Sequence, residues 1–138
     1  MDHFLQILLV DDDLDDRDIF IWVMRKIYSP SIIATAADGL EALDMLRRED
    51  YRPDLVFLDL NMPRMNGLDC LRTIRQDDKL NDLAVIIYST SSNPHDITQS
   101  QAAGATDYIV KGNELATIKR ELIQALKKLA PRLFPHEL

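Results

Sequence analysis

Short apolar runs recur along the chain, and each is followed by a longer stretch in which apolar and polar residues are mixed. The runs cover residues 7–10, 31–36, 55–58, 84–88 and 108–110, and they are rich in Ile, Val and Leu. Apolar runs of this length, bounded by turn residues, are typical of the strands of a parallel sheet, and the runs at 7–10, 55–58 and 84–88 indicate strands buried in its interior. The pattern therefore predicts five strands.

The mixed stretches carry apolar residues three or four positions apart, which predicts a helix after each strand. These helices are expected over about residues 15–28, 39–50, 68–75, 95–103 and 114–129. Trp22 lies in the first of them, which is already rich in apolar residues, and we expect it to pack inside. The last helix has the most regular apolar face, made of Leu115, Ile118, Leu122, Leu126 and Leu129.

Alternation of five strands and five helices predicts the class of the fold. Each connection is long enough for the right-handed crossover that parallel strands require. We expect an α/β, doubly wound (βα)5 fold of the flavodoxin-like type, with a five-stranded parallel sheet in the order 2-1-3-4-5. One domain should span residues 5–129, followed by a short tail, residues 130–138, and no output domain. In the tail, Leu133 and Phe134 could cover the body of the domain or join a dimer.

Composition and charge narrow the classes of function. The chain is 46% hydrophobic and 28% charged, as expected for a globular protein. Its net charge of −7 disfavours direct binding of nucleic acid. The single cysteine, Cys70, excludes an internal disulfide and fits a reducing compartment. Without a membrane-length apolar run or a signal peptide, a cytoplasmic location is expected.

Polar residues follow four of the five predicted strands. Asp11 and Asp12 come after the first strand, Asp59 after the third, Ser89 near the end of the fourth and Lys111 after the fifth. In a parallel α/β sheet the carboxyl ends of the strands meet at one edge, where ligands bind. We therefore expect these five residues to converge.

The three aspartates predict a metal site. Carboxylates a few ångströms apart repel one another, which raises their pKa values unless a cation compensates. Oxygen ligands favour a hard ion, and Mg²⁺ commonly combines one or two carboxylates with water and phosphate oxygens. We assign Asp12 and Asp59 as direct ligands, the backbone carbonyl of Asn61 as a third, and Asp11 as a ligand through water.

The same arrangement suits transfer of a phosphoryl group to Asp59. A carboxylate can act as a nucleophile and form an acyl phosphate. The added negative charge would be offset by Mg²⁺ on one side and by the ammonium group of Lys111 on the other. Ser89 is placed to donate a hydrogen bond to a phosphoryl oxygen. Asp13, Asp15 and Asp16 are interpreted as acids that favour the start of a helix or face solvent.

Four segments in order carry a resemblance to a known family: ILLV followed by acids, LDLNMPRMNG, the strand ending in YST, and YIVK. Together they resemble the receiver domain of two-component response regulators. The resemblance implies that Asp11 and Asp12 are the acidic pair, Asp59 the phosphoacceptor, Ser89 the hydroxyl switch and Lys111 the phosphate partner.

The resemblance extends to further positions. It implies that Tyr108 is the switch aromatic, and that Asn61 and Ser91 tune the rate at which the phosphoaspartate hydrolyses. One position departs from the pattern, because Gly112 stands where the family usually has a proline after a cis peptide bond.

The function implied is that of a single-domain response regulator of the chemotaxis or phytochrome-associated type. Its partners would be a histidine kinase or phosphotransfer protein and a downstream protein target, with no membrane and no direct nucleic-acid contact. Mg²⁺-dependent self-phosphorylation from a phosphodonor and slow autodephosphorylation are expected, and not metabolic catalysis. A homodimer could form through the face built by the fourth helix, the fifth strand and the fifth helix.

Two other classes of function compete with this interpretation. Mg²⁺-dependent aspartyl phosphatases also use an aspartate after a strand, but they need a second acid two residues later, where this chain has Asn61. Pro63 also departs from their pattern. A binding module that keeps the fold without being phosphorylated is the third alternative, and Gly112 is the feature that leaves it open.

Overall fold

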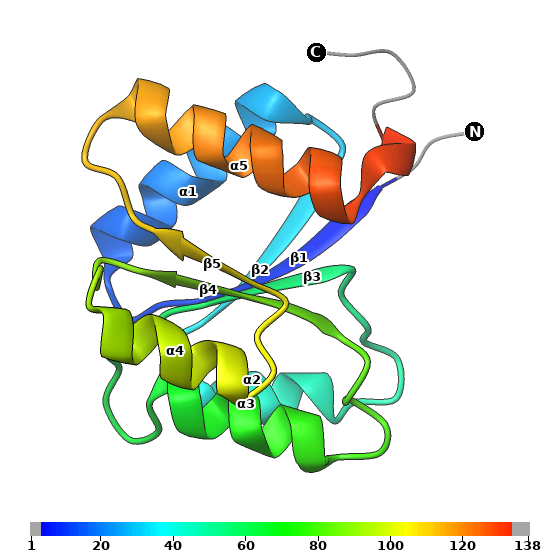
Figure 1. The fold of residues 1–138 in the computed structure, drawn as a ribbon. Coiled ribbons are helices and arrows are strands. Elements are labelled where there is room, and N and C mark those ends of the chain that lie inside the picture. Colours follow the sequence, from blue (N-terminus) through cyan, green and yellow to red (C-terminus); the bar gives the residue numbers. More distant parts are fainter. Residues whose placement is uncertain (1–3, 134–138) are drawn as a thin grey trace.

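Five parallel strands form one central sheet in the computed structural model of the chain, which describes residues 4–133 (Figure 1). The order of the strands is β2-β1-β3-β4-β5, and every neighbouring pair is parallel. This confirms the predicted doubly wound, flavodoxin-like arrangement. The strands are β1 (Leu5–Val10), β2 (Ser31–Ala36), β3 (Leu55–Leu58), β4 (Ala84–Ser89) and β5 (Asp107–Val110).

Helices cover both faces of the sheet, with α1 and α5 on one side and α2, α3 and α4 on the other (Figure 1). Their bounds agree with the expected ones to within about two residues, except that α2 ends four residues early. The helices are α1 (Leu14–Ile27), α2 (Gly39–Leu46), α3 (Gly67–Gln76), α4 (Pro94–Ala102) and α5 (Leu115–Leu129), and a 3-10 turn follows at Pro131–Leu133. Within residues 4–133 no helix combines the length and apolarity needed to cross a bilayer.

The sheet divides the core into two apolar clusters, because successive side chains of a strand point to opposite faces. On β1, Leu5, Ile7 and Leu9 pack toward α1 and α5, whereas Leu8 and Val10 pack toward α2 and α3. Three aromatic rings, Phe20, Phe57 and Tyr88, fill the first cluster in edge-to-face contacts with centroids 4.9 to 6.1 Å apart. This packing fixes the strands whose ends carry the polar residues.

Side-chain caps start the helices close to the strand ends. The carboxylate of Asp13 accepts the backbone N–H of Asp16 at the start of α1, and Asp38 does the same for Glu41 at α2. Each cap satisfies a backbone donor that lacks a partner in the first turn. Because α1 begins four residues after β1 ends, its first turn lies at the edge of the sheet.

The side chains of Trp22 and Leu115 are mostly exposed, contrary to expectation. Trp22 is 55% exposed, and Leu115 is 52% exposed. The inward face of α1 is already filled by Phe20, Val23 and Met24, so Trp22 lies on its outer side. Leu115 is the first residue of α5 and lies at its exposed end. The prediction that both pack inside was wrong.

The tail begins with a packed residue. Leu133 is buried against the α1 and α5 side of the core, which agrees with one of the two possibilities for the tail. Its neighbour Phe134 lies outside the described residues.

Gly67 allows the start of α3 to approach the end of β3. Its N–H donates to the carbonyl oxygen of Leu60, and a Cβ added at this position would collide with the backbone of Asp59 and Leu60. Backbone atoms at this depth cannot move aside as the end of a flexible side chain can. The glycine therefore fixes how the loop leaves Asp59.

We expect Gly67→Ala to lower the free energy of unfolding by about 2 to 4 kcal/mol, because the overlap is with backbone. Urea denaturation measures this loss. The matched control is Gly39→Ala, whose Cβ would meet mainly the flexible side chain of Met65 and should cost less. Equal losses in the two variants would contradict this account of Gly67.

Candidate functional site

The backbone ladder continues one residue past the ends of the strands and fixes the polar residues there. The N–H of Asp11 donates to Ala36 at 3.0 Å, that of Asp59 to Val10 at 3.0 Å, and that of Lys111 to Ser89 at 2.7 Å. Each residue is therefore held in the sheet by its main chain. Their side chains emerge at the same edge, as predicted.

Asp11, Asp12 and Asp59 form a group of carboxylates that could hold a metal ion. Each offers an oxygen within 4.8 Å of those of the other two. Asp11 is buried, Asp59 is 9% exposed and Asp12 is exposed, so the group opens to solvent on one side. One oxygen of Asp11 accepts the N–H of Asp13 at 3.0 Å, which orients its carboxylate. Three oxygen donors of this kind fit a hard divalent cation.

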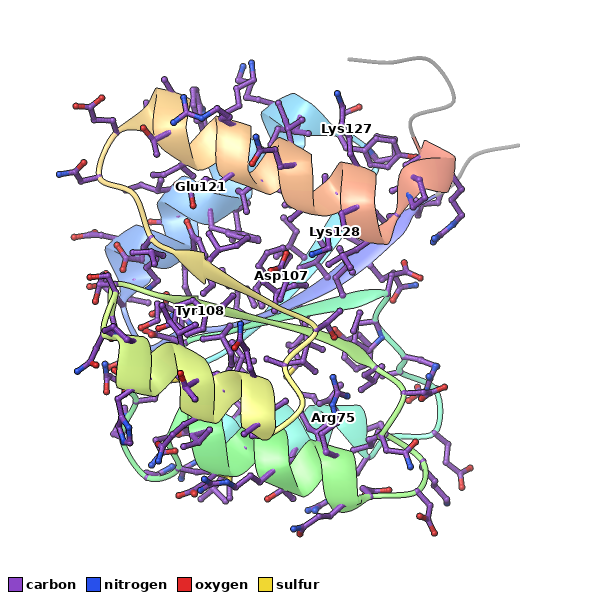
Figure 2. The ribbon with its side chains drawn as sticks, viewed as in Figure 1. Arg75, Asp107, Tyr108, Glu121, Lys127 and Lys128 are labelled. Carbon is purple, nitrogen blue, oxygen red and sulfur yellow. The ribbon has the colours of Figure 1, made fainter. Side chains whose placement is uncertain are left out.

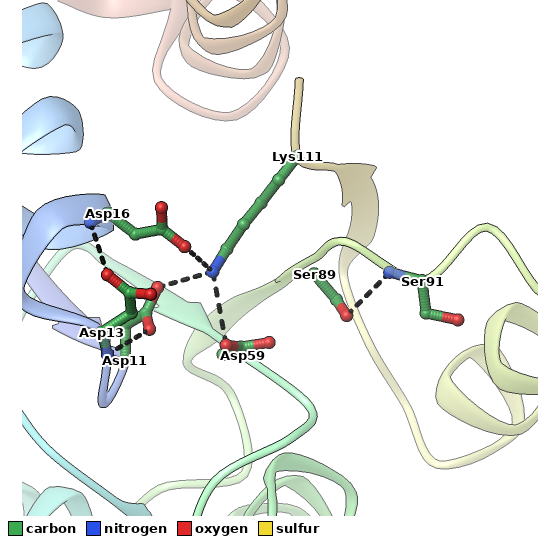
Figure 3. Close-up of polar contacts among 7 residues, drawn as sticks. All are labelled: Asp11, Asp13, Asp16, Asp59, Ser89, Ser91 and Lys111. Atoms are coloured by element: carbon green, nitrogen blue, oxygen red, sulfur yellow. Dashed lines mark hydrogen bonds and ion pairs between the residues drawn. The ribbon is translucent and has the colours of Figure 1, made fainter. Parts of the chain in front are cut away.

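Lys111 reaches into this group from β5. Its ammonium nitrogen lies 2.7 Å from an oxygen of Asp11, 3.0 Å from one of Asp16 and 3.3 Å from one of Asp59 (Figure 3). A lysine ammonium has three N–H donors, so each of the three contacts can take one. The side chain is only 7% exposed, which strengthens these ion pairs relative to pairs at the surface.

The residue after Lys111 is the glycine at which the sequence departs from the family pattern. No peptide bond among residues 4–133 is cis, so the bond between Lys111 and Gly112 is trans. Lys111 nevertheless contacts Asp59, so proline is not needed at this position for the lysine to reach the carboxylates.

Burial and neighbouring charges shift the pKa of Asp59 upward. Desolvation is the largest cause, and the negative charge of Asp11 adds to it, while Lys111 opposes both. For Lys111, burial would lower the pKa, but the hydrogen bond to Asp11 and the charges of Asp59 and Asp11 outweigh burial and raise it. Lys111 therefore stays protonated at neutral pH, and the Asp59 carboxylate is left with incomplete compensation.

Ser89 is the last residue of β4, and Ser91 lies in the loop between β4 and α4. Ser89 is fully buried, and its hydroxyl oxygen accepts the N–H of Ser91 at 3.2 Å (Figure 3). The hydroxyl of Ser91 donates to Asp96 at 2.6 Å. The Tyr108 hydroxyl donates to the carbonyl oxygen of Ser91 at 2.8 Å, so the half-buried ring of Tyr108 is tied to the same loop.

Asn61 is exposed in the loop that follows Asp59. The loop is held to the start of α2, because Arg64 makes two hydrogen bonds to Asp38 of 2.8 and 3.2 Å. Arg64 has a φ of 63°, a left-handed conformation that is uncommon outside glycine. The hydrogen bond of Arg64 is the largest cause that lowers the pKa of Asp38.

Sequence reasoning missed two contacts of Lys111. Asp16 was interpreted only as an acid that favours a helix start or faces solvent, yet it pairs with Lys111. The ammonium of Lys111 also lies 5.6 Å from the ring centroid of Tyr88. The contact of Asp16 could have been predicted from its position three residues after the helix cap Asp13. This position is in the first turn of α1, which lies at the edge of the sheet.

Comparison with known proteins gives a consistent result. The family model of the response regulator receiver domain matches residues 7–125. The chain is 36% identical over 125 residues to the chemotaxis protein CheY-3 of Vibrio cholerae, which covers 91% of this chain and 94% of CheY-3.

Solved structures agree with this match. The phosphorylated cyanobacterial phytochrome response regulator RcpA superimposes with a TM-score of 0.85 and 30% identity, over 92% of this chain and 94% of RcpA. The Mn²⁺-bound response regulator Rcp1 gives a TM-score of 0.80 and 27% identity, over 97% and 98% of the two chains. The chain therefore belongs to the response regulator receiver domain family.

Proposed function

We propose that the protein is a phosphorylatable receiver in which Asp59 accepts a phosphoryl group from a histidine kinase or phosphotransfer protein. The observation that supports this most directly is the convergence of three carboxylates and one ammonium at the sheet edge. Two relatives agree with it, since RcpA is described as phosphorylated and Rcp1 as Mn²⁺-bound. The receiver unit is proposed to span residues 5–129 and to act in the cytoplasm.

The residues that would hold Mg²⁺ are Asp12 and Asp59 directly, Asn61 through its backbone carbonyl, and Asp11 through water. These oxygen donors match the preference of the ion. When bound, Mg²⁺ would offset the charge of the carboxylates and of the incoming phosphoryl oxygens.

Asp59 is the proposed nucleophile because its carboxylate is partly accessible. It contacts the ammonium of Lys111 and belongs to the group of carboxylates that would hold Mg²⁺. An oxygen of Asp59 would form a bond to phosphorus while the bond between phosphorus and the donor breaks. Lys111 would follow the new charge, since its ammonium is 3.3 Å from Asp59 before transfer. Ser89 would donate its hydroxyl hydrogen to a phosphoryl oxygen. The bond from the N–H of Ser91 uses the oxygen of this hydroxyl and not its hydrogen.

The response to phosphorylation is proposed to pass through the loop after β4 to the face built by α4, β5 and α5. Tyr108 lies on this face, and its hydroxyl donates a hydrogen bond to the carbonyl oxygen of Ser91. A movement of the loop that follows Ser89 would therefore move the acceptor of this bond. Asp107 and Lys128, 3.6 Å apart, lie on the same face (Figure 2). A downstream protein, or a second copy of the chain, would bind one of the two arrangements more tightly.

Phosphorylation by acetyl phosphate tests this function. Incubation with acetyl phosphate and Mg²⁺ should add one phosphate to the protein, as measured by intact mass spectrometry, and EDTA should prevent it. Asp59→Asn should lose the label because the nucleophile is gone. The control Asp50→Asn removes an exposed carboxylate outside the site and should label like the wild type. Equal labelling of Asp59→Asn would refute the assignment.

The raised pKa of Asp59 predicts how stability depends on pH. A carboxyl whose folded-state pKa lies above its unfolded value near 3.8 favours folding at low pH, and this contribution is lost as pH rises through the folded pKa. In Mg²⁺-free buffer, Asp59→Asn should therefore be more stable than the wild type at pH 7. Its advantage should shrink as the pH falls toward 3.8.

Urea denaturation of the wild type and Asp59→Asn between about pH 3.5 and 7 measures this difference, because the range includes the unfolded pKa of the carboxyl group. Other titrating groups are the same in both proteins and cancel to first order. Addition of Mg²⁺ should stabilise the wild type more than the variant. A variant that is less stable than the wild type at pH 7 would contradict the pKa argument.

A further inference from the structure

Asp16 shares Lys111 with the metal-binding carboxylates without belonging to their group. Its carboxylate lies 3.0 Å from the ammonium of Lys111. It is absent from the set of Asp11, Asp12 and Asp59, whose oxygens lie within 4.8 Å of one another. Asp16 is thus a further partner for the lysine, and it approaches the ammonium from the first turn of α1 next to Asp11 (Figure 3).

This placement bears on a conflict between the two cations of the site. Lys111 contacts Asp11 at 2.7 Å and Asp59 at 3.3 Å, two of the carboxylates that would serve Mg²⁺. An ammonium and a dication at the same oxygens repel each other, and the repulsion is little screened at a lysine that is only 7% exposed. Metal binding therefore requires the lysine to loosen these contacts, and a buried ammonium without a counter-charge is costly.

We propose that Asp16 is a positioning residue that retains the ammonium of Lys111 while Asp11 and Asp59 turn to Mg²⁺. This inference rests on the proposed function, since it concerns how the site loads its metal. Lys111 would remain paired with Asp16 and close to Asp59, where its ammonium can bind the phosphoryl group. Asp16 contacts the lysine and acts on the metal through it.

Local structure holds Asp16 in place for this role. Its backbone N–H is bonded to the cap residue Asp13 at 3.0 Å, in the first turn of α1. Its side chain is 38% exposed, so the pair with Lys111 costs less desolvation than a fully buried pair. The ring centroid of Tyr88 lies 5.6 Å from the ammonium and makes a further favourable contact with it. Tyr88 is not one of the proposed metal ligands, so metal binding would not compete for this contact.

The test compares Asp16→Asn with Asp15→Asn. Both variants remove one negative charge from the first turn of α1, and Asp15 is exposed. The Mg²⁺ dissociation constant of each is measured by NMR titration of backbone amides, without any phosphodonor, and circular dichroism checks that each is folded. Both variants should bind Mg²⁺ more weakly, but Asp16→Asn should lose about fivefold more affinity than Asp15→Asn, the scale of one partly exposed ion pair.

A second background isolates the part played by the lysine. In Lys111→Met protein, Asp16 has no ammonium to hold, so Asp16→Asn and Asp15→Asn should weaken Mg²⁺ binding equally. The proposal is overturned if the two variants behave alike in the wild-type background. It is also overturned if the extra loss persists in Lys111→Met, because Asp16 would then act on the metal directly.

Failure of this proposal can be told apart from failure of the proposed function. A wild-type protein that binds Mg²⁺ and takes phosphate from acetyl phosphate, with equal effects of the two asparagine variants, removes the role of Asp16 alone. A wild-type protein that shows no Mg²⁺ binding overturns both.

Discussion

The pairing of the strands holds negatively charged carboxylates close together at one edge of the sheet. Parallel pairing places the residue after β1 beside the residue after β3, and both are aspartates held by backbone hydrogen bonds. The aspartates cannot separate without breaking the sheet beneath them. Asp11 and Asp59 are therefore fixed near each other, and their repulsion must be balanced by a cation.

The ammonium of Lys111 supplies part of this positive charge. It pairs with Asp11, Asp16 and Asp59 at 3.3 Å or less, but it leaves the pKa of Asp59 raised. One positive charge among several carboxylates is incomplete compensation, and the raised pKa of Asp59 is its consequence. Lys111 directly follows β5, the strand that also carries Tyr108. The carboxylates are therefore connected through this strand to the face on which Tyr108 lies.

Much of the fold followed from the sequence because strand and helix patterns agreed with each other. The five apolar runs marked the strands, and their alternation with helices predicted a parallel sheet. The order 2-1-3-4-5 is that of the flavodoxin-like variant of this fold, and it brings the acidic strand ends together. The location of Trp22 was wrong because a periodic pattern does not show how much of a helix face the core can accept. Phe20, Val23 and Met24 already filled that space.

The site could be predicted as far as the ends of strands determine it. Asp11, Asp59 and Lys111 meet because register places them, and register follows from the pattern. The contact of Asp16 could not be read in this way, since it depends on the angle at which α1 leaves the sheet. The bond from Tyr108 to Ser91 likewise depends on a loop conformation that no residue pattern specifies.

Anomalous diffraction from crystals grown with Mn²⁺ tests the central claim most directly, because Mn²⁺ favours the same oxygen ligands as Mg²⁺. We expect one strong anomalous peak bonded to oxygens of Asp12 and Asp59 and to the backbone carbonyl of Asn61, with Lys111 still paired with Asp16. A peak elsewhere on the protein, or none at saturating Mn²⁺, would contradict the account.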